Sequence, residues 1–261
     1  EAPGDPLAFG LESSCGSSFA FGHNQRIVAA ALGDPSAIEY ATEYFSKPHR
    51  TNMSPFTSNH DAFAGQRLWD RMRGDEARYR LAAATYLLQS VAPPFVYYGE
   101  EIGMSGAARL GGDHKLRTPM SWSSETVGAG FTTVEPFRAL AANHISRNVT
   151  AQIQDPTSLW SFYRDVIRLR REHVTLLRGD YQRSSVDGWT ASFQRALPGR
   201  RTLLVFNYGE TAAKAVAEQL PSNAKLQRLW PDYAELMSAD ANGRVELLVP
   251  GLSFAVFDVV E

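Results

Sequence analysis

The stretch YRLAAATYLLQSVAPPFVYYGEEIGM, residues 79–104, decides the fold class. Its first half repeats apolar residues at helical spacing and is rich in alanine, and Asp75 stands where it can cap a helix over residues 79–91. Two prolines end that helix, because proline cannot continue the backbone hydrogen bonds. The continuous apolar run at 95–98 then predicts a short strand that is buried on both faces.

The same alternation of helix and strand extends upstream. Residues 26–45 have helical periodicity, and Gly-Asp-Pro at 33–35 divides them into two short predicted helices. The run MSPFTS at 53–58 has the composition of a strand, and it stops where the polar tripeptide NHD begins at 59–61. Helix, strand, helix, strand is the order of a parallel α/β fold. We therefore expect three polar side chains to crowd one strand end.

Downstream, residues 105–154 are rich in glycine and proline, and a loop of this length in a compact domain is usually functional. Residues 156–158 then open a helix with one apolar stripe. We expect four of its arginines on a solvated face: Arg164, Arg168, Arg170 and Arg171.

The sequence pattern changes after Gly179, where short apolar runs alternate with turn sequences. This pattern predicts an antiparallel β domain of about 80 residues, and we place the domain boundary near Arg178. We expect one side of its core to bury Leu203, Val205 and Phe206, and the other to bury Leu247, Val249, Phe254, Val256 and Phe257.

Composition excludes several classes of protein. The 261 residues are 44% hydrophobic and 21% charged, which is ordinary for a globular chain, and no apolar run is long enough to span a bilayer as a helix. A net charge of −2 offers no general attraction to nucleic acid or to an anionic membrane surface. The single cysteine, Cys15, excludes an intramolecular disulfide, and the six histidines lack the spacing of a zinc site.

The N-terminal residues EAPGDPLAFG have neither the basic start nor the apolar core of a signal peptide, and no initiator Met precedes them. We expect the chain to begin in the middle of a longer protein. Its compartment is left open, with a secreted or periplasmic protein preferred over a cytoplasmic one.

The order of five segments resembles the α-amylase family of glycoside hydrolases, family 13. They are FTSNHD (56–61), PPFVYYGEEIGM (93–104), RTPMSWS (117–123), AGFT (129–132) and DPTSLWSFYRDVIRLR (155–170). NHD alone would be a weak signal, but NHD followed in order by the other phrases is a strong one. LESSCGSSFAFG (11–22) resembles the strand-six region of that family.

The resemblance implies the C-terminal part of a (β/α)8 barrel, strands six to eight, over residues 1–178, followed by an all-β sandwich over 179–261. A whole barrel takes about 250 residues, so strands one to five are missing. In this family the nucleophilic aspartate follows strand four and the acid/base glutamate follows strand five. The resemblance therefore implies a fragment without its nucleophile, and we expect the isolated chain to be inactive.

The resemblance also assigns roles to individual residues. Asp61 corresponds to the third catalytic carboxylate, which binds the distorted sugar more strongly in the transition state than in the ground state. His60 corresponds to a histidine that contacts substrate, and Asn59 lies beside it and is expected to orient the loop. Arg117 is available for contacts to hydroxyl or carboxylate groups, although a structural salt bridge with Asp113 is an equal alternative. Read without the family, NHD merely ends a strand.

Other polar and aromatic residues are weaker candidates. Glu1 can be read as the general acid of the family, while Glu100 and Glu101 lie in a phrase that the family uses mainly as scaffold. Three aromatic side chains are candidates for stacking on sugar rings: Trp69, Tyr98 and Trp122.

The implied activity is retaining hydrolysis of α-1,4 glucosidic bonds in starch or malto-oligosaccharides. Transglycosylases and α-1,6-glucosidases share these motifs, and a non-catalytic scaffold, such as the amylase-like ectodomain of amino-acid transporter heavy chains, is the alternative from another class. We expect no metal or cofactor in this chain, although calcium is possible in the full-length protein. The expected partners are an α-glucan and either the missing N-terminal half or a second copy of the chain.

Overall fold

A computed structural model describes residues 16–232 and 236–260. Its first elements form one crossover unit, in which β1 (Ser18–Phe19) pairs in parallel with β2 (Met53–Ser54). Helices α1 (His23–Ala31) and α2 (Pro35–Glu43) connect the two strands, and η2 (Tyr44–Ser46) follows α2. A parallel pair joined by helices confirms the α/β character predicted for this part of the chain.

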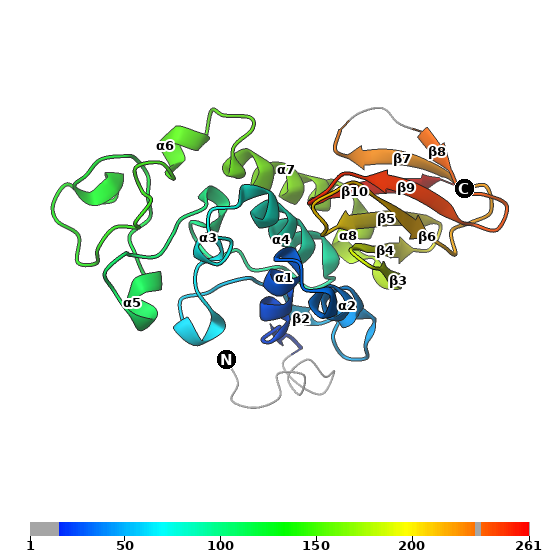
Figure 1. Ribbon diagram of the computed structural model, residues 1–261, viewed down its shortest axis with the longest axis horizontal. Helices are drawn as coiled ribbons and strands as arrows, with labels where there is room; N and C mark the ends of the chain where they lie inside the picture. The colour runs from blue at the N-terminus through cyan, green and yellow to red at the C-terminus, as the bar shows by residue number, and fades with distance from the viewer. Residues whose placement is uncertain (1–15, 233–235, 261) are drawn as a thin grey trace.

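Helix α4 (Glu76–Gln89) packs beside α1, and helix α7 (Leu159–Glu172) packs beside α4 (Figure 1). Helix α4 begins at Asp75, whose carboxylate accepts a hydrogen bond of 3.1 Å from the Arg78 amide. Helix α7 begins at Ser158, whose hydroxyl accepts one of 3.2 Å from the Ser161 amide. The shorter α3 (Leu68–Arg71) precedes α4, and α8 (Val174–Arg178) follows α7.

The strand predicted at residues 95–98 is not formed, and the expectation that it is buried on both faces is wrong. This segment is extended, but its Phe95 amide makes a single 2.9 Å hydrogen bond to the Pro55 carbonyl oxygen, and the Phe95 side chain is 50% exposed. A strand in a parallel sheet is stabilised by a neighbour on each side. Within the described part of the chain, this segment has a neighbour on one side only. The three expected barrel strands are therefore reduced to β1, β2 and an extended segment.

The glycine-rich stretch 105–154 is more regular than predicted, since it contains α5 (Gly112–Leu116), η5 (Gly128–Gly130) and α6 (Val149–Gln152). Asn143 ties it to the preceding turn, because its side-chain amide donates to the Gly103 carbonyl oxygen at 2.9 Å and accepts from the Ser105 amide at 2.9 Å. Two further turns, η3 (Ala62–Ala64) and η4 (Glu100–Ile102), follow β2 and the extended segment.

From Asp180 onward the described chain is built of antiparallel strands, shown at the right of Figure 1. Six form one sheet in the order β3-β4-β5-β10-β7-β8, and β6 pairs with β9 in a second sheet. Their bounds are β3 Asp180–Asp187, β4 Thr190–Leu197, β5 Arg200–Asn207, β6 Ala213–Ala217, β7 Lys225–Trp230, β8 Leu236–Ser238, β9 Val245–Val249 and β10 Ser253–Val260.

The two faces of the six-stranded sheet bury different clusters. One face packs against β6 and β9, where Leu203 and Val205 meet Leu247 and Val249. The other face packs against the helices and buries Phe206. Our expectation that Phe206 shares a side with Leu203 and Val205 is wrong, because neighbouring side chains of a strand point to opposite faces. By the same alternation, Phe254 and Val256 face the helices, whereas Phe257 faces β9.

Two buried arginines join the helices to this sheet at the C-terminal end of α4. Arg170 of α7 donates to the Leu87 and Ser90 carbonyl oxygens at 2.9 and 2.7 Å, and Arg195 of β4 donates to that of Ser90 at 2.8 Å. Burial lowers the pKa of Arg170 to about 10 and that of Arg195 to about 9, so both stay charged at neutral pH. The prediction that Arg170 lies on a solvated face is wrong, because the last carbonyl groups of a helix need donors from elsewhere.

Burial of His23 predicts sensitivity to acid. Its ring is fully buried and stacks on Tyr44 with 3.9 Å between ring centroids, and burial lowers the pKa of His23 from 6.5 to about 3. Between these two pH values the unfolded chain binds a proton that the folded chain does not. His23 is therefore expected to lower the free energy of unfolding by about 1.4 kcal/mol for each pH unit below 6.5. Urea denaturation of His23→Phe at several pH values should show a shallower loss in acid, with the exposed His114→Phe as control.

Candidate functional site

The NHD tripeptide follows β2 and is shaped by a local turn. The Asn59 side-chain oxygen accepts a 2.8 Å hydrogen bond from the Asp61 amide. Asparagine favours such turns because its side chain reaches the backbone two residues ahead. The side-chain oxygen of Asn59 is therefore used within the loop.

The structure brings Asp61, His60 and Arg117 together, although Arg117 lies far along the chain. Arg117 Nη2 is 2.6 Å from Asp61 Oδ1, and His60 Nε2 is 3.2 Å from Asp61 Oδ2. Arg117 Nε also donates to the His60 carbonyl oxygen at 2.9 Å. A guanidinium can bridge a carboxylate and a carbonyl in this way because its donors form a planar fork. We refer to Asp61, His60 and Arg117 as the NHD cluster.

Arg117 also forms the salt bridge that the sequence offered as an alternative. Its Nη2 atom is 2.9 Å from Asp113 Oδ2, and the other Asp113 oxygen accepts from the Ala62 amide at 2.8 Å. The structural salt bridge is thus formed, and a contact of Arg117 with substrate stays a prediction. The same guanidinium nitrogen thus contacts two carboxylates, that of Asp61 within the NHD cluster and that of Asp113 outside it.

The NHD cluster presents polar atoms at the surface while its central carboxylate is shielded. The Asp61 side chain is 14% exposed, that of Arg117 is 39% exposed and that of His60 is 55% exposed. An imidazole, a carboxylate and a guanidinium together offer donors and acceptors to neighbouring hydroxyl groups, as a sugar ring would need. Glycosidic cleavage takes in addition a nucleophile and a proton donor on either side of the bond.

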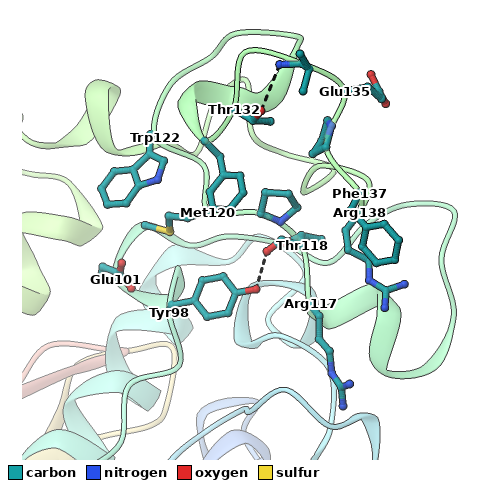
Figure 2. A pocket seen from close by; sticks show the side chains of 14 residues that line it. Tyr98, Glu101, Arg117, Thr118, Met120, Trp122, Thr132, Glu135, Phe137 and Arg138 are labelled. Atoms are coloured by element: carbon teal, nitrogen blue, oxygen red, sulfur yellow. Dashed lines mark hydrogen bonds between the residues drawn. The ribbon is translucent and has the colours of Figure 1, made fainter.

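A pocket of about 820 Å³ lies beside Arg117 and is lined mainly by apolar and aromatic side chains (Figure 2). Tyr98 and Trp122, two of the predicted stacking residues, line it, and Tyr98 is fixed by a 2.6 Å hydrogen bond from its hydroxyl to the Thr118 carbonyl oxygen. Trp69, the third predicted stacking residue, does not line it, and the Arg147 guanidinium lies 4.1 Å from the centroid of its ring.

Sequence reasoning missed two aromatic residues of this pocket. Phe131 and Phe137 both line it, and they are 58% and 93% exposed. Phe131 belongs to the AGFT phrase, which marked this stretch without giving the residue a role. No signal in the sequence distinguished Phe137 from a phenylalanine of the core.

The remaining acidic candidates differ in position. Glu100 is 1% exposed and lies beneath the NHD loop, and burial raises its pKa to about 7. Burial also raises the pKa of Glu101, which lines the pocket. Glu1, the candidate general acid, and Cys15 lie outside the residues that the structure describes.

Comparison with known proteins identifies the family to which this chain belongs. The profile described as the alpha amylase catalytic domain matches residues 20–179, a span that includes the NHD cluster and the pocket. The chain belongs to the α-amylase family of glycoside hydrolases. The family that the sequence motifs indicated is thereby confirmed.

Members of the α-amylase family with different activities match the chain. It is similar to a trehalose synthase of Thermus thermophilus, at 34% identity over 206 residues, which are 74% of this chain and 20% of that protein. It is also similar to an oligo-1,6-glucosidase of Parageobacillus thermoglucosidasius, at 26% identity, covering 52% of this chain and 31% of that protein. The chain thus spans 20% to 31% of the length of these two relatives.

Among solved structures, an α-amylase from H. orenii superposes with a TM-score of 0.74 at 22% identity. The match covers 93% of this chain and 49% of that one, and at this identity it establishes the fold alone. Within residues 16–232 and 236–260, no helix is long and apolar enough to cross a membrane. Over the same residues, no group of three or more acidic, histidine or cysteine side chains is placed to hold a metal ion.

Proposed function

We propose that this chain supplies one wall of the active site of a retaining enzyme that hydrolyses α-1,4 glucosidic bonds in starch or malto-oligosaccharides. The observation that carries the proposal is the NHD cluster, in which Asp61 is held by Arg117 at 2.6 Å beside an aromatic pocket. Family membership supports a glycosidase or a glycosyl-transferring enzyme.

In the proposed mechanism, two carboxylates from the remainder of the full-length protein act as nucleophile and proton donor. Asp61 accepts hydrogen bonds from hydroxyls of the distorted sugar, and these bonds strengthen as positive charge develops on the ring. His60 Nε2, which is 3.2 Å from Asp61 Oδ2, is placed to contact the same sugar. Tyr98 and Trp122 present rings in the adjacent pocket that suit the apolar face of a further glucose unit.

A second candidate function is glycosyl transfer or cleavage of α-1,6 bonds. It is supported by the similarity to a trehalose synthase and to an oligo-1,6-glucosidase. Phe131 and Phe137 favour it as well, because they add exposed aromatic surface to the pocket on which an acceptor sugar could stack.

We also propose that the apolar surface left open by this chain is covered by the rest of a longer protein or by a second copy. Phe95, Val134 and Phe137 are 50%, 66% and 93% exposed. Exposed apolar side chains of this size often mark an interface when they form a contiguous patch.

The test of function uses the full-length protein that contains this chain. Incubation with maltotriose, maltose and isomaltose, followed by proton NMR of the anomeric signals, is expected to show α-configured products from an α-1,4 substrate. Trehalose from maltose would favour transfer, and glucose from isomaltose would favour α-1,6 cleavage. The 261-residue chain alone is the control and is expected to give no turnover, because the nucleophile lies elsewhere. A folded full-length protein inert on all three sugars would leave a scaffold role instead.

A further inference from the structure

A buried carboxylate lies directly beneath the loop that carries the NHD cluster. Glu100 Oε1 accepts a hydrogen bond of 2.7 Å from the Thr57 hydroxyl and one of 2.5 Å from the Ser58 hydroxyl. All three side chains are at most 2% exposed. Since Thr57 and Ser58 immediately precede Asn59, this carboxylate fixes the residues from which the tripeptide projects.

Glu100 is in turn held by helix α4. The Tyr86 hydroxyl donates to Glu100 Oε2, the other carboxylate oxygen, at 3.1 Å. The Tyr79 hydroxyl donates to the main-chain carbonyl oxygen of Glu100 at 2.7 Å. Gly99, just before it, has a φ of 84°, and a Cβ atom there would lie 2.5 Å from the Met104 sulfur. The turn therefore needs glycine at 99, and it places the Glu100 carboxylate between α4 and the NHD loop.

We propose that Glu100 is a positioning residue for the reaction, which holds Asp61 and His60 in their working geometry through the hydroxyls of Thr57 and Ser58. This inference rests on the proposed function, since it is that function which gives Asp61 its role. Glu100 itself does not reach the surface where a sugar would bind.

Core packing alone does not need a carboxylate at this position. A glutamine side chain of the same size would fill this position without the cost of burying a charge, but its amide oxygen would accept the two hydroxyl hydrogens more weakly than a carboxylate does. Arg71 is a cation that interacts with the Glu100 carboxylate. It also contacts the loop, because its Nη1 atom donates to the Thr57 carbonyl oxygen at 3.5 Å. Other titratable groups facing Glu100 are Arg67 and the hydroxyls of Tyr79, Tyr86 and Tyr163.

The placement of the loop should therefore depend on pH. Burial raises the pKa of Glu100 to about 7, against the opposing effect of the hydrogen bonds from Ser58, Thr57 and Tyr86. Above that pH the ionised carboxylate accepts from both loop hydroxyls. Below it, one oxygen carries a proton and must find an acceptor, so the two hydroxyls are held differently.

The experiment measures the backbone amide signals of residues 59–61 by nitrogen-15 NMR in the 261-residue chain. Glu100→Gln is expected to shift these amides. Thr57→Val and Ser58→Ala, which remove the two donors, should shift the same amides. Tyr86→Phe is the matched control. It removes a hydrogen bond from the same carboxylate, but at Oε2, which accepts from neither loop hydroxyl. The amide shifts in Tyr86→Phe should be at least threefold smaller than those in Glu100→Gln.

A pH series completes the test. Because an imidazole also titrates near neutrality, the series is recorded in His60→Gln. The amides of Asn59 and Asp61 should titrate with a midpoint of about 7 in that background and lose this step when Glu100→Gln is added. Unchanged amide positions of His60 and Asp61 in Glu100→Gln would overturn the proposal. This readout needs no turnover, so it separates failure of the positioning role from failure of the proposed function.

Discussion

Replacing Asp61 by asparagine is expected to lower kcat for α-glucan cleavage by about 100- to 1000-fold in the full-length protein, with KM changed by less than about threefold. The reason is that the carboxylate is proposed to bind the sugar most strongly when charge develops in the transition state. Arg117 keeps its 2.9 Å contact with Asp113 in the variant, so the guanidinium is not left unpaired and the loop should keep its fold.

Asp113→Asn is the matched control for Asp61→Asn. It removes a carboxylate charge from the same guanidinium, but at a residue outside the tripeptide, and the Asp113 side chain is 43% exposed. We expect it to lower kcat by less than about tenfold. Steady-state kinetics on maltotriose decide the matter. An unchanged kcat in Asp61→Asn, or an equal loss in both variants, would contradict the role proposed for Asp61.

Replacing Arg195 by methionine is expected to lower the free energy of unfolding by about 3 to 5 kcal/mol. Arg195 is fully buried and donates to the carbonyl oxygens of Gln89 and Ser90 at 3.1 and 2.8 Å, and to that of Gly179 at 2.9 Å. Methionine fills much of the space but donates nothing, so these buried oxygens lose hydrogen bonds from a charged donor.

Guanidinium denaturation followed by far-UV circular dichroism measures the effect of Arg195→Met. Arg200→Met, at an exposed position on the neighbouring strand, is the control and should cost less than about 0.5 kcal/mol. The core shared by the helices and the six-stranded sheet further predicts a single transition. A loss in Arg195→Met no greater than that in the control would show that Arg195 does not stabilise the junction.

Local sequence signals predicted the helices well. Asp75 caps α4 as predicted, and α7 begins directly after residues 156–158 as predicted, because a helix start involves only residues within one turn of it. The segment 95–98 misled us for the opposite reason. Its apolar run has the composition of a buried strand, but whether a strand forms depends on partners elsewhere in the chain.

The candidate site was predictable only in part. The salt bridge of Arg117 with Asp113 follows from their spacing, whereas the 2.6 Å contact of Arg117 with Asp61 joins residues 56 positions apart, and no local pattern predicts it. Glu100 was assigned to scaffold correctly as far as its burial goes, but its two hydroxyl partners came to light only in the folded chain. Arg170 misled us because a charged residue in an amphipathic helix ordinarily faces solvent.

The junction between the helices and the sheet has a consequence for building chimeras with relatives. Arg170 and Arg195 recognise main-chain carbonyl groups at the end of α4, and Tyr181 of β3 donates to the Thr42 carbonyl oxygen in the same manner. Any sequence that forms a helix ending at the same residue presents these main-chain acceptors, so the two arginines do not restrict which side chains α4 carries. One inserted residue, by contrast, would move the acceptors by about 1.5 Å and turn them by about 100°. For the contacts of these two arginines, exchange is therefore limited by the length of α4, whereas Tyr79 and Tyr86 must be kept for their hydrogen bonds to Glu100.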